Sequence, residues 1–362
     1  MVRYKALDAF RGLTIALMIL VNTPGSWSHI YWPFSHSDWN GYTPTDLVFP
    51  FFLFIVGSAM FFSFQKSDFQ LSVLAFQKIL KRAFWIFVIG LGLNILNLFA
   101  VDSGNWSDLR IMGVLQRIAI AYVLAATIVL SLGRVWILIL SLALLLFYWL
   151  LLMVLGGDSP LGLQGNIVRH VDMAVLGAHH MWQGKGLPFD PEGLLSSIPA
   201  IVNMLLGFEA TRYLTSIEDK KESVWRLAGL GIVAVLLATL WDLVWPINKS
   251  LWSGSYVLVS TGWALLLLAG FIWIMDVKGR VLEPLLVYGM NPLFIYVVSW
   301  VWMIFYLWIP VGDSSLFDLV FSWFLAGDAA NKAASFLFAF VHVYIFWLIC
   351  LWLYRRNIVV KL

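Results

Sequence analysis

The residues best suited to chemistry lie in a short polar segment, residues 35–46, that directly precedes a long apolar stretch. Histidine exchanges protons near neutral pH, so His36 can accept a proton from an amine or hydroxyl nucleophile. Thr43 can also cap the next helix, Pro44 suits its first position, and Asp46 can reach back to the cap. The segment therefore predicts either a general base at His36 or an interfacial histidine beside a capped helix.

Two further polar segments could bind a ligand. Residues 246–256 carry Asn248 and Lys249, and we expect this pair to contact a substrate. Residues 156–195 carry Asp172 and Glu192, whose carboxylates could hold a cationic or polyhydroxylated molecule. The second group also sits where a turn would lead into the next helix, so a purely structural role stays open.

Charged residues inside apolar stretches are the third group, because a charge in hydrocarbon is costly and normally has a function or a partner. Asp8 and Arg11 are three residues apart and can pair on one helix. Arg117 has no such local partner. It indicates either an anion such as a phosphate, or a carboxylate from another helix.

The composition limits the elements that could position these residues. The chain has 362 residues, of which 61% are hydrophobic and 12% are charged, whereas soluble proteins carry about 25% charged residues. This excludes a cytosolic enzyme, a disordered chain and a nucleic-acid binder. With a single cysteine, Cys350, no intramolecular disulfide can form.

Apolar runs of about 20 residues, long enough to cross a bilayer, predict an all-α polytopic membrane bundle with one domain over residues 1–362. We expect ten transmembrane helices, at residues 7–24, 46–64, 83–101, 113–132, 135–155, 196–214, 226–245, 256–275, 285–308 and 333–354.

The basic residues indicate the orientation. If the N-terminus is cytoplasmic, 17 of the 23 Lys and Arg residues fall on the cytoplasmic side, as the positive-inside rule requires. Both termini are therefore expected in the cytoplasm, and the two long loops at residues 23–45 and 156–195 on the outer side.

Common cofactor motifs are absent from the sequence. There is no P-loop, no GxGxxG after a strand, no CxxC and no HExxH. His179 and His180 are adjacent and point in different directions, so they do not form a metal site by spacing. We therefore predict no metal.

Several strings resemble the heparan-alpha-glucosaminide N-acetyltransferase family, in its bacterial branch. The similarity runs from about residue 3 to about residue 300. The strings are LDAFRGLTI at 7–15, LVNTPG at 20–25, HSDWNGYTPTDLVFP at 36–50, GVLQRIA at 113–119, FDPEGLLS at 189–196 and PINKSLW at 246–252.

The resemblance implies a transmembrane enzyme that moves acetyl from cytoplasmic acetyl-CoA to the amino group of glucosamine, or a related amino sugar, at the outer side. It implies that His36 is catalytic, as a base or a transient acyl carrier, and we expect Asn22 and Asn40 to orient it or to polarise the thioester. Arg11 and Arg117 are the expected contacts for acetyl-CoA.

A bacterial inner-membrane location and a possible homodimer complete the expectation. The first helix starts within ten residues of Met1, without the lumenal extension of lysosomal members, which favours a free or short amino sugar as acceptor. Two alternatives stay open: a transporter of sugars or amino acids, and an acyltransferase acting on a glycan hydroxyl.

Overall fold

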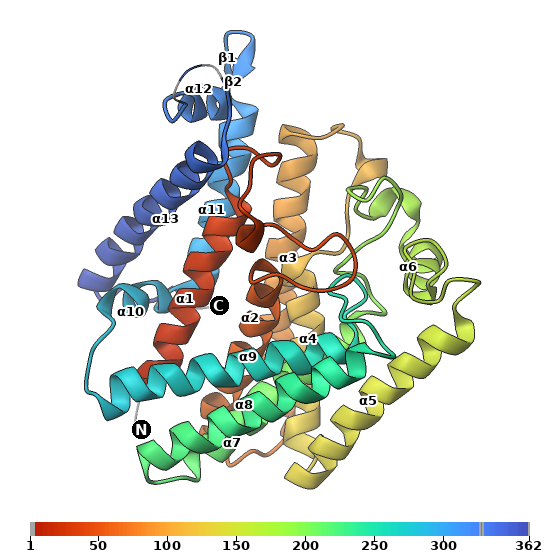
Figure 1. Cartoon of the computed structure of the whole chain (residues 1–362), viewed down its shortest axis with the longest axis vertical. Helices are drawn as coiled ribbons and strands as arrows, with labels where there is room; N and C mark the ends of the chain where they lie inside the picture. The colour runs from red at the N-terminus through yellow and green to blue at the C-terminus, as the bar shows by residue number, and fades with distance from the viewer. Residues whose placement is uncertain (1–3, 326, 328, 361–362) are drawn as a thin grey trace.

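The computed structural model describes residues 4–325, 327 and 329–360, and these residues form a bundle of helices (Figure 1). The α-helices are α1 (Lys5–Asn22), α2 (Val48–Phe64), α3 (Val73–Ala100), α4 (Val114–Ser131), α5 (Arg134–Leu155), α6 (Ile167–Leu176), α7 (Ser197–Thr215), α8 (Lys220–Asp242), α9 (Gly254–Ile272), α10 (Glu283–Gly289), α11 (Pro292–Trp308), α12 (Leu316–Ser322) and α13 (Lys332–Arg355).

Shorter elements join these helices. The strands β1 (Pro310–Val311) and β2 (Ser314–Ser315) form a small antiparallel hairpin before α12. Short 3₁₀ turns lie at Trp32–Phe34, Thr45–Leu47, Gln65–Ser67, Trp106–Asp108 and Ala178–His180, and a π-helical turn at Trp273–Val277 extends α9.

The apolar runs of the sequence all lie on helices. By length and composition, seven of the described helices could cross a membrane, and the bent pair of α10 and α11 would make an eighth span. The chain is thus a multi-pass membrane protein. The predicted helices at residues 7–24 and 196–214 correspond to α1 and α7, which are not among the seven, so the count of ten spans stays a prediction.

One predicted span, residues 285–308, is not a single helix. The chain bends by 81° between α10 and α11, at Asn291 and Pro292. Proline has no N–H to donate and disfavours helical backbone at the preceding residue, and Asn291 accordingly leaves the helical region with φ of −129° and ψ of 57°. Hydropathy alone does not reveal this break.

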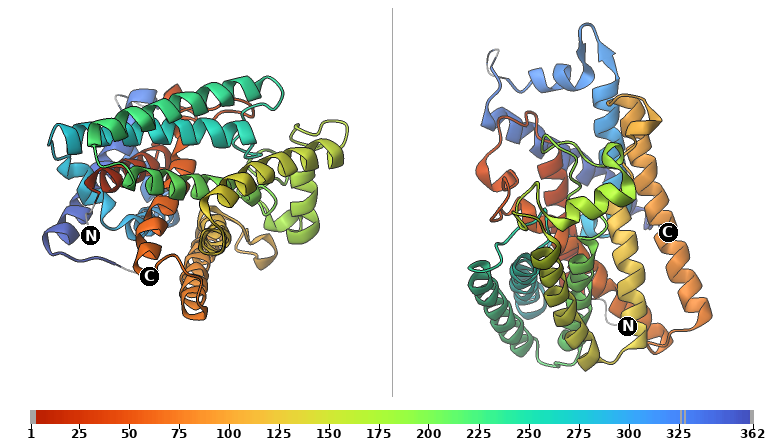
Figure 2. Two further views of the ribbon diagram at one scale, coloured as in Figure 1. Left: turned by 90° about the horizontal axis from the view of Figure 1, so that it is seen from below. Right: turned by 90° about the vertical axis from the view of Figure 1, so that its right-hand side faces the viewer.

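The helices pack as neighbouring pairs. α8 runs along α9, α2 packs against α7, α1 packs against α10, and α3 against α4. Figure 1 shows α7, α8 and α9 as a layer across the lower part of the molecule, and Figure 2 shows α3 and α4 side by side along one edge. Helices at the periphery, such as α5 and α8, expose many large apolar side chains that suit lipid contact.

Four connections meet at one end of the bundle, here called the loop end: residues 23–47, 101–113, 156–196 and 243–253. They are joined by long-range hydrogen bonds, including Trp39 Nε1 to Leu161 O at 2.9 Å and Ile111 N to His180 O at 3.1 Å. The predicted topology places these four connections on the same side of the membrane, and the contacts agree with it.

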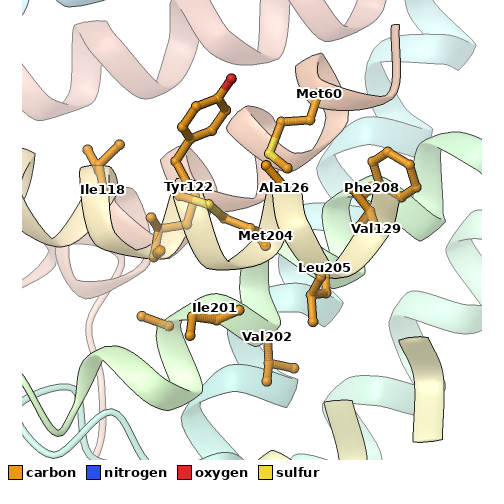
Figure 3. Close-up of a cluster of buried hydrophobic side chains, with 14 of the residues drawn as sticks. Met60, Ile118, Tyr122, Ala126, Val129, Ile201, Val202, Met204, Leu205 and Phe208 are labelled. Atoms are coloured by element: carbon orange, nitrogen blue, oxygen red, sulfur yellow. The ribbon is translucent and has the colours of Figure 1, made fainter. Parts of the chain in front are cut away.

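The core below the loop end depends on the close approach of α2 and α7. A Cβ added at Gly57 would lie 2.0 Å from the Met204 carbonyl oxygen, and one at Gly207 would lie 2.0 Å from the Phe54 carbonyl oxygen. Small residues let two membrane helices touch backbone to backbone. The side chains around this contact pack with α4, as Figure 3 shows for Ile118, Tyr122, Ala126, Ile201, Met204, Leu205 and Phe208.

Replacing Gly207 with leucine should force α2 and α7 apart. We expect Gly207→Leu to cost about 1–3 kcal/mol, as overpacking typically does, and to lower the Tm of the protein in detergent. Gly229→Leu is the matched control, because a Cβ at Gly229 meets nothing within 4 Å. Equal Tm values for the two variants would contradict this account of the contact.

Candidate active site

His36 is held by a buried carboxylate at the loop end. The His36 Nδ1 atom lies 2.7 Å from Asp46 Oδ1, and the Asp46 side chain is fully buried. The other oxygen, Oδ2, accepts hydrogen bonds at 3.0 Å from the backbone N–H groups of Ser37 and Thr43. Asp46 reaches back to Thr43 as predicted, but Thr43 does not cap the helix: the helical turn begins after Pro44, and the Thr43 hydroxyl donates to Ser35 O. The same carboxylate also binds the histidine.

This contact sets the tautomer of the neutral imidazole. A carboxylate accepts hydrogen bonds, so the Nδ1–H of His36 donates to Asp46. In this neutral form the Nε2 atom keeps its lone pair, as a general base or a nucleophile requires.

Lys249 completes the polar group around His36. Its Nζ lies 3.0 Å from His36 Nδ1 and 3.3 Å from Asp46 Oδ1. Since Nδ1 carries the proton directed at Asp46, the ammonium group donates to the carboxylate. The structure thus brings together two predicted site residues that are 213 positions apart.

The predicted residues Asn40 and Asn248 join the two loops that carry His36 and Lys249. Asn248 Nδ2 donates to Asn40 Oδ1 at 3.1 Å, and Gly41 N donates to Ile247 O at 2.7 Å. Asn248 also accepts from the backbone N–H of Leu251. Both amides therefore hold the loops in register, and His36 and Lys249 are positioned as a consequence.

His36 opens into a small cavity of about 120 Å³, here called the His36 cavity. Its polar lining combines residues of four elements: Thr14 and Asn22 of α1, His36 and Thr45 before α2, Glu192 before α7, and Lys249 before α9. The rest is apolar or aromatic, with Phe49, Phe52, Leu115, Ile118, Leu293, Tyr296 and Trp300. Asn22 and Glu192, both predicted as site residues, therefore share a cavity with His36.

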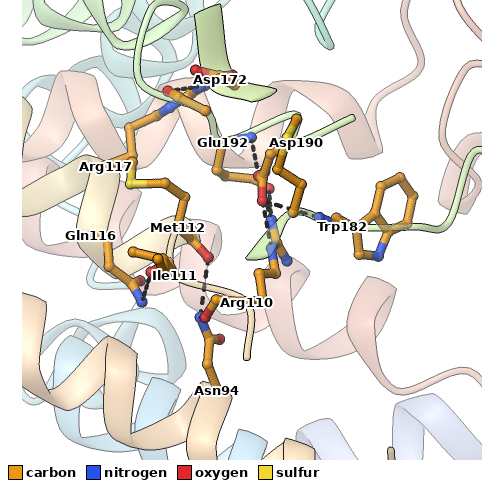
Figure 4. Close-up of polar contacts among 12 residues, drawn as sticks. Asn94, Arg110, Ile111, Met112, Gln116, Arg117, Asp172, Trp182, Asp190 and Glu192 are labelled. Atoms are coloured by element: carbon orange, nitrogen blue, oxygen red, sulfur yellow. Dashed lines mark hydrogen bonds and ion pairs between the residues drawn. The ribbon is translucent and has the colours of Figure 1, made fainter. Parts of the chain in front are cut away.

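Glu192 is fixed by an arginine that sequence reasoning missed. Arg110 donates to both oxygens of Asp190 at 2.7 and 2.8 Å and to Glu192 Oε2 at 2.7 Å (Figure 4). Burial opposes the charges, but this pairing raises the pKa of Arg110 and lowers that of Asp190. Only its position directly before the apolar run of α4 could have drawn attention to Arg110.

Asp172 and Arg117 lie behind this loop, and neither lines a cavity described here. Asp172 is fully buried, and its Oδ1 accepts from the backbone N–H of Leu194 at 2.9 Å. Arg117, also fully buried, donates to Gly193 O at 3.0 Å and to Ser196 Oγ. Both predicted site residues thus contact the loop that carries Glu192.

Two further spaces adjoin the His36 cavity, and one of them is much larger. A polar cleft of about 810 Å³ at the loop end shares Val114, Leu115, Tyr296 and Trp300 with it. A cavity of about 110 Å³ on the other side, here called the Arg82 cavity, shares Phe52, Leu115, Ile118 and Leu293 with it and is also lined by Arg11 and Arg82. Leu115 lines all three spaces, so they meet around this side chain.

The burial of Asp172 should make stability depend on pH. Burial, only partly offset by the Leu194 hydrogen bond, raises the pKa of Asp172 to about 6. The folded state therefore binds this proton more tightly than the unfolded state, and stability falls as pH rises from about 4 to about 6. We expect Asp172→Asn to gain up to about 3 kcal/mol relative to wild type over this range.

Thermal unfolding in detergent from pH 4 to 7 measures this difference. Asp158→Asn, which changes an exposed carboxylate near the same end, is the control and should follow the wild type. If the Asp172→Asn and wild-type curves stay parallel, Asp172 does not change protonation in the folded state.

Comparisons with known proteins identify the family of the chain. The family model for the catalytic region of heparan-alpha-glucosaminide N-acetyltransferase matches residues 3–239. The heparan-alpha-glucosaminide N-acetyltransferase of Mus musculus is 31% identical over 355 residues, which cover 82% of this chain and 53% of that protein. The Homo sapiens protein of that name is 31% identical over 354 residues, covering 82% and 52%.

The chain spans about half the length of the curated relatives it matches. The family match covers more than half of the chain and includes His36, Asp46, Arg110 and Glu192. The predicted resemblance is confirmed: the chain belongs to the heparan-alpha-glucosaminide N-acetyltransferase family.

Proposed function

We propose that this protein transfers an acetyl group from acetyl-CoA to the amino group of glucosamine or a related amino sugar. The observation that carries the proposal is the His36–Asp46 pair, which faces a cavity between a polar cleft and a second cavity that contains two arginines. Donor and acceptor can approach His36 from opposite sides in this arrangement. The names of the two relatives support the reaction class.

The reaction needs one proton acceptor. The neutral amine attacks the thioester carbonyl carbon, the carbon–sulfur bond breaks, and the proton lost by the amine passes to His36 Nε2. The same proton can then return to the departing thiolate of CoA. Asp46 keeps Nδ1 protonated throughout, and it stabilises the imidazolium that forms between the two transfers.

On the acceptor side, Glu192 is the group best placed to attract an amine, because it lines the His36 cavity while Arg110 holds one of its oxygens. Asn22 lines the same cavity and can orient the acceptor or the carbonyl. Asp172, Asn40 and Asn248 serve the same site by holding its loops.

On the donor side, Arg11 and Arg82 can pair with the phosphates of acetyl-CoA. Arg11 is partly engaged already, since it donates to Gly289 O and Asp8, whereas Arg82 stacks over the ring of Tyr122. A donor-binding role for Arg117 stays a prediction, and its contacts with Gly193 and Ser196 support a role in holding the loop.

We place the protein in the inner membrane of a bacterium, with both termini cytoplasmic and the loop end outside. This orientation rests on the positive-inside bias of the sequence. Acetyl-CoA would then enter from the cytoplasm through the Arg82 cavity, and the amino sugar from outside through the polar cleft.

Removing the imidazole should abolish transfer. With purified protein, acetyl-CoA and glucosamine, we expect His36→Ala to lower turnover by about 10² to 10⁴, as the loss of a general base does. Asp46→Asn should also lower it by about 10²-fold or more, because an amide can present its NH₂ group to Nδ1 and reverse the tautomer. His29→Ala is the control, since His29 bonds only to Ser26 and Ser28 in the same outer segment.

The Tm of each variant shows whether the fold is intact. More than a tenth of wild-type turnover in a folded His36→Ala protein would exclude His36 as the base. Counterflow of glucosamine in liposomes without any acetylation would favour a transporter instead.

Variants of two neighbouring basic residues, Arg82 and Lys81, test the proposed donor site. Arg82→Gln should raise the KM for acetyl-CoA about tenfold, equivalent to about 1.4 kcal/mol of lost charge-assisted contact, while the acceptor KM is unchanged. Lys81→Gln removes an adjacent exposed charge that does not line the Arg82 cavity, and its donor KM should match wild type. Equal KM values for both variants would argue against this entry route.

A further inference from the structure

The polar cleft is much larger than the reaction requires. The His36 cavity, at about 120 Å³, has room for an amino group and part of one ring, whereas the adjoining cleft measures about 810 Å³. Spaces of this size hold ligands as large as a drug molecule. An acceptor that enters the His36 cavity by its amino end would therefore leave most of the cleft unfilled unless it is an extended molecule.

The lining of the cleft suits sugar rings. Trp182, Tyr296 and Trp300 offer flat aromatic faces, on which the apolar face of a pyranose can stack. Tyr296 and Trp300 also line the His36 cavity, so the aromatic surface continues from the cleft to the reaction centre. Trp182 lies farther out, beside the Arg110 cluster (Figure 4).

The polar groups of the cleft are mostly hydrogen-bond acceptors. The amide nitrogens of Asn94 and Gln183 each donate to two backbone carbonyls, which leaves their amide oxygens to bind a ligand. The Gln116 nitrogen donates to one, Ile111 O. Asp102 and Asp108 add carboxylates. A molecule with many donors, such as one bearing hydroxyl and ammonium groups, fits this surface.

The charges of the cleft select against an anionic glycan. Arg110, one of two basic side chains among the described lining residues, is already paired with Asp190 and Glu192. The other, His179, lies 3.5 Å from Asp108. A hydrogen bond from Ser103 lowers the pKa of Asp108, which keeps it ionised. A sulfate group would find no unpaired cation on this surface, but an ammonium group would find carboxylates.

We propose that the polar cleft binds an oligosaccharide of unsubstituted, unsulfated glucosamine units, with the terminal unit in the His36 cavity and the following units stacked along Trp300, Tyr296 and Trp182. This assignment rests on the proposed function, and it extends the proposed acceptor from a single amino sugar to a cationic chain. The ammonium groups of the outer units face Asp102 and Asp108, and the terminal amine faces His36 and Glu192.

Acceptor kinetics of the purified full chain test this assignment. With acetyl-CoA fixed, we expect the KM to fall about tenfold or more from glucosamine to its trimer. A disaccharide of the same rings that carries a sulfate on the second unit should bind more weakly than the unsulfated disaccharide. An equal KM for monomer and trimer, or tighter binding of the sulfated disaccharide, would overturn the proposal.

Two tryptophan variants test whether the lower KM of the trimer depends on the cleft. Trp182→Ala should reduce the monomer-to-trimer KM ratio to about threefold or less, whereas Trp106→Ala, at an exposed tryptophan that does not line the cleft, should keep the wild-type ratio. A ratio unaffected by Trp182→Ala would also overturn the assignment. Failure to acetylate any acceptor would instead contradict the proposed function, so the two failures are distinguishable.

Discussion

The geometry of the candidate active site depends on one buried carboxylate, that of Asp46. A buried charge is costly unless it is paired and hydrogen-bonded. This carboxylate accepts hydrogen bonds from Ser37, Thr43 and His36, so the loop before α2 folds around it. The Tyr256 hydroxyl donates to the backbone carbonyl of Asp46 from α9. The imidazole therefore takes its position because the buried carboxylate needs hydrogen-bond donors.

The loops that surround this carboxylate form a connected scaffold. The His36 loop is bonded to the α8–α9 connection through Gly41 and Asn40, and to the α5–α6 connection through Trp39. Loops are normally the mobile part of a protein, but here each is fixed by bonds to another loop far away in sequence. The helices below keep the points where these loops begin and end at a constant spacing, because α2 and α7 touch backbone to backbone.

Sequence patterns located the helices well because long apolar runs leave few alternatives in a chain this poor in charge. They failed at Asn291 and Pro292, where the bend depends on backbone chemistry inside an apolar run. For the site, residue type singled out His36, Lys249 and Glu192, but nothing in one sequence shows that they share a cavity.

The predicted roles of charged residues were harder to assign. Arg117 has no local partner in sequence, which suggested a ligand, yet the fold gives it backbone and hydroxyl partners in the loop that precedes α7. Arg110 looked ordinary, although it pairs with two carboxylates. In both cases the deciding partner lies more than 70 residues away, so only the tertiary structure reveals it.

The Asp46 carboxylate also explains how the site can hold a positive charge on the imidazole. It is fully buried and lies 2.7 Å from His36 Nδ1, so it stabilises the imidazolium that would form when His36 accepts a proton. Because hydrogen bonds from Ser37 and Thr43 already fix this carboxylate, it needs no rearrangement when the charge forms. The cavity that His36 lines has largely apolar walls, and an electrostatic attraction in such surroundings is stronger than in water. The attraction that holds the histidine in the loop therefore also supports its proposed role as a base.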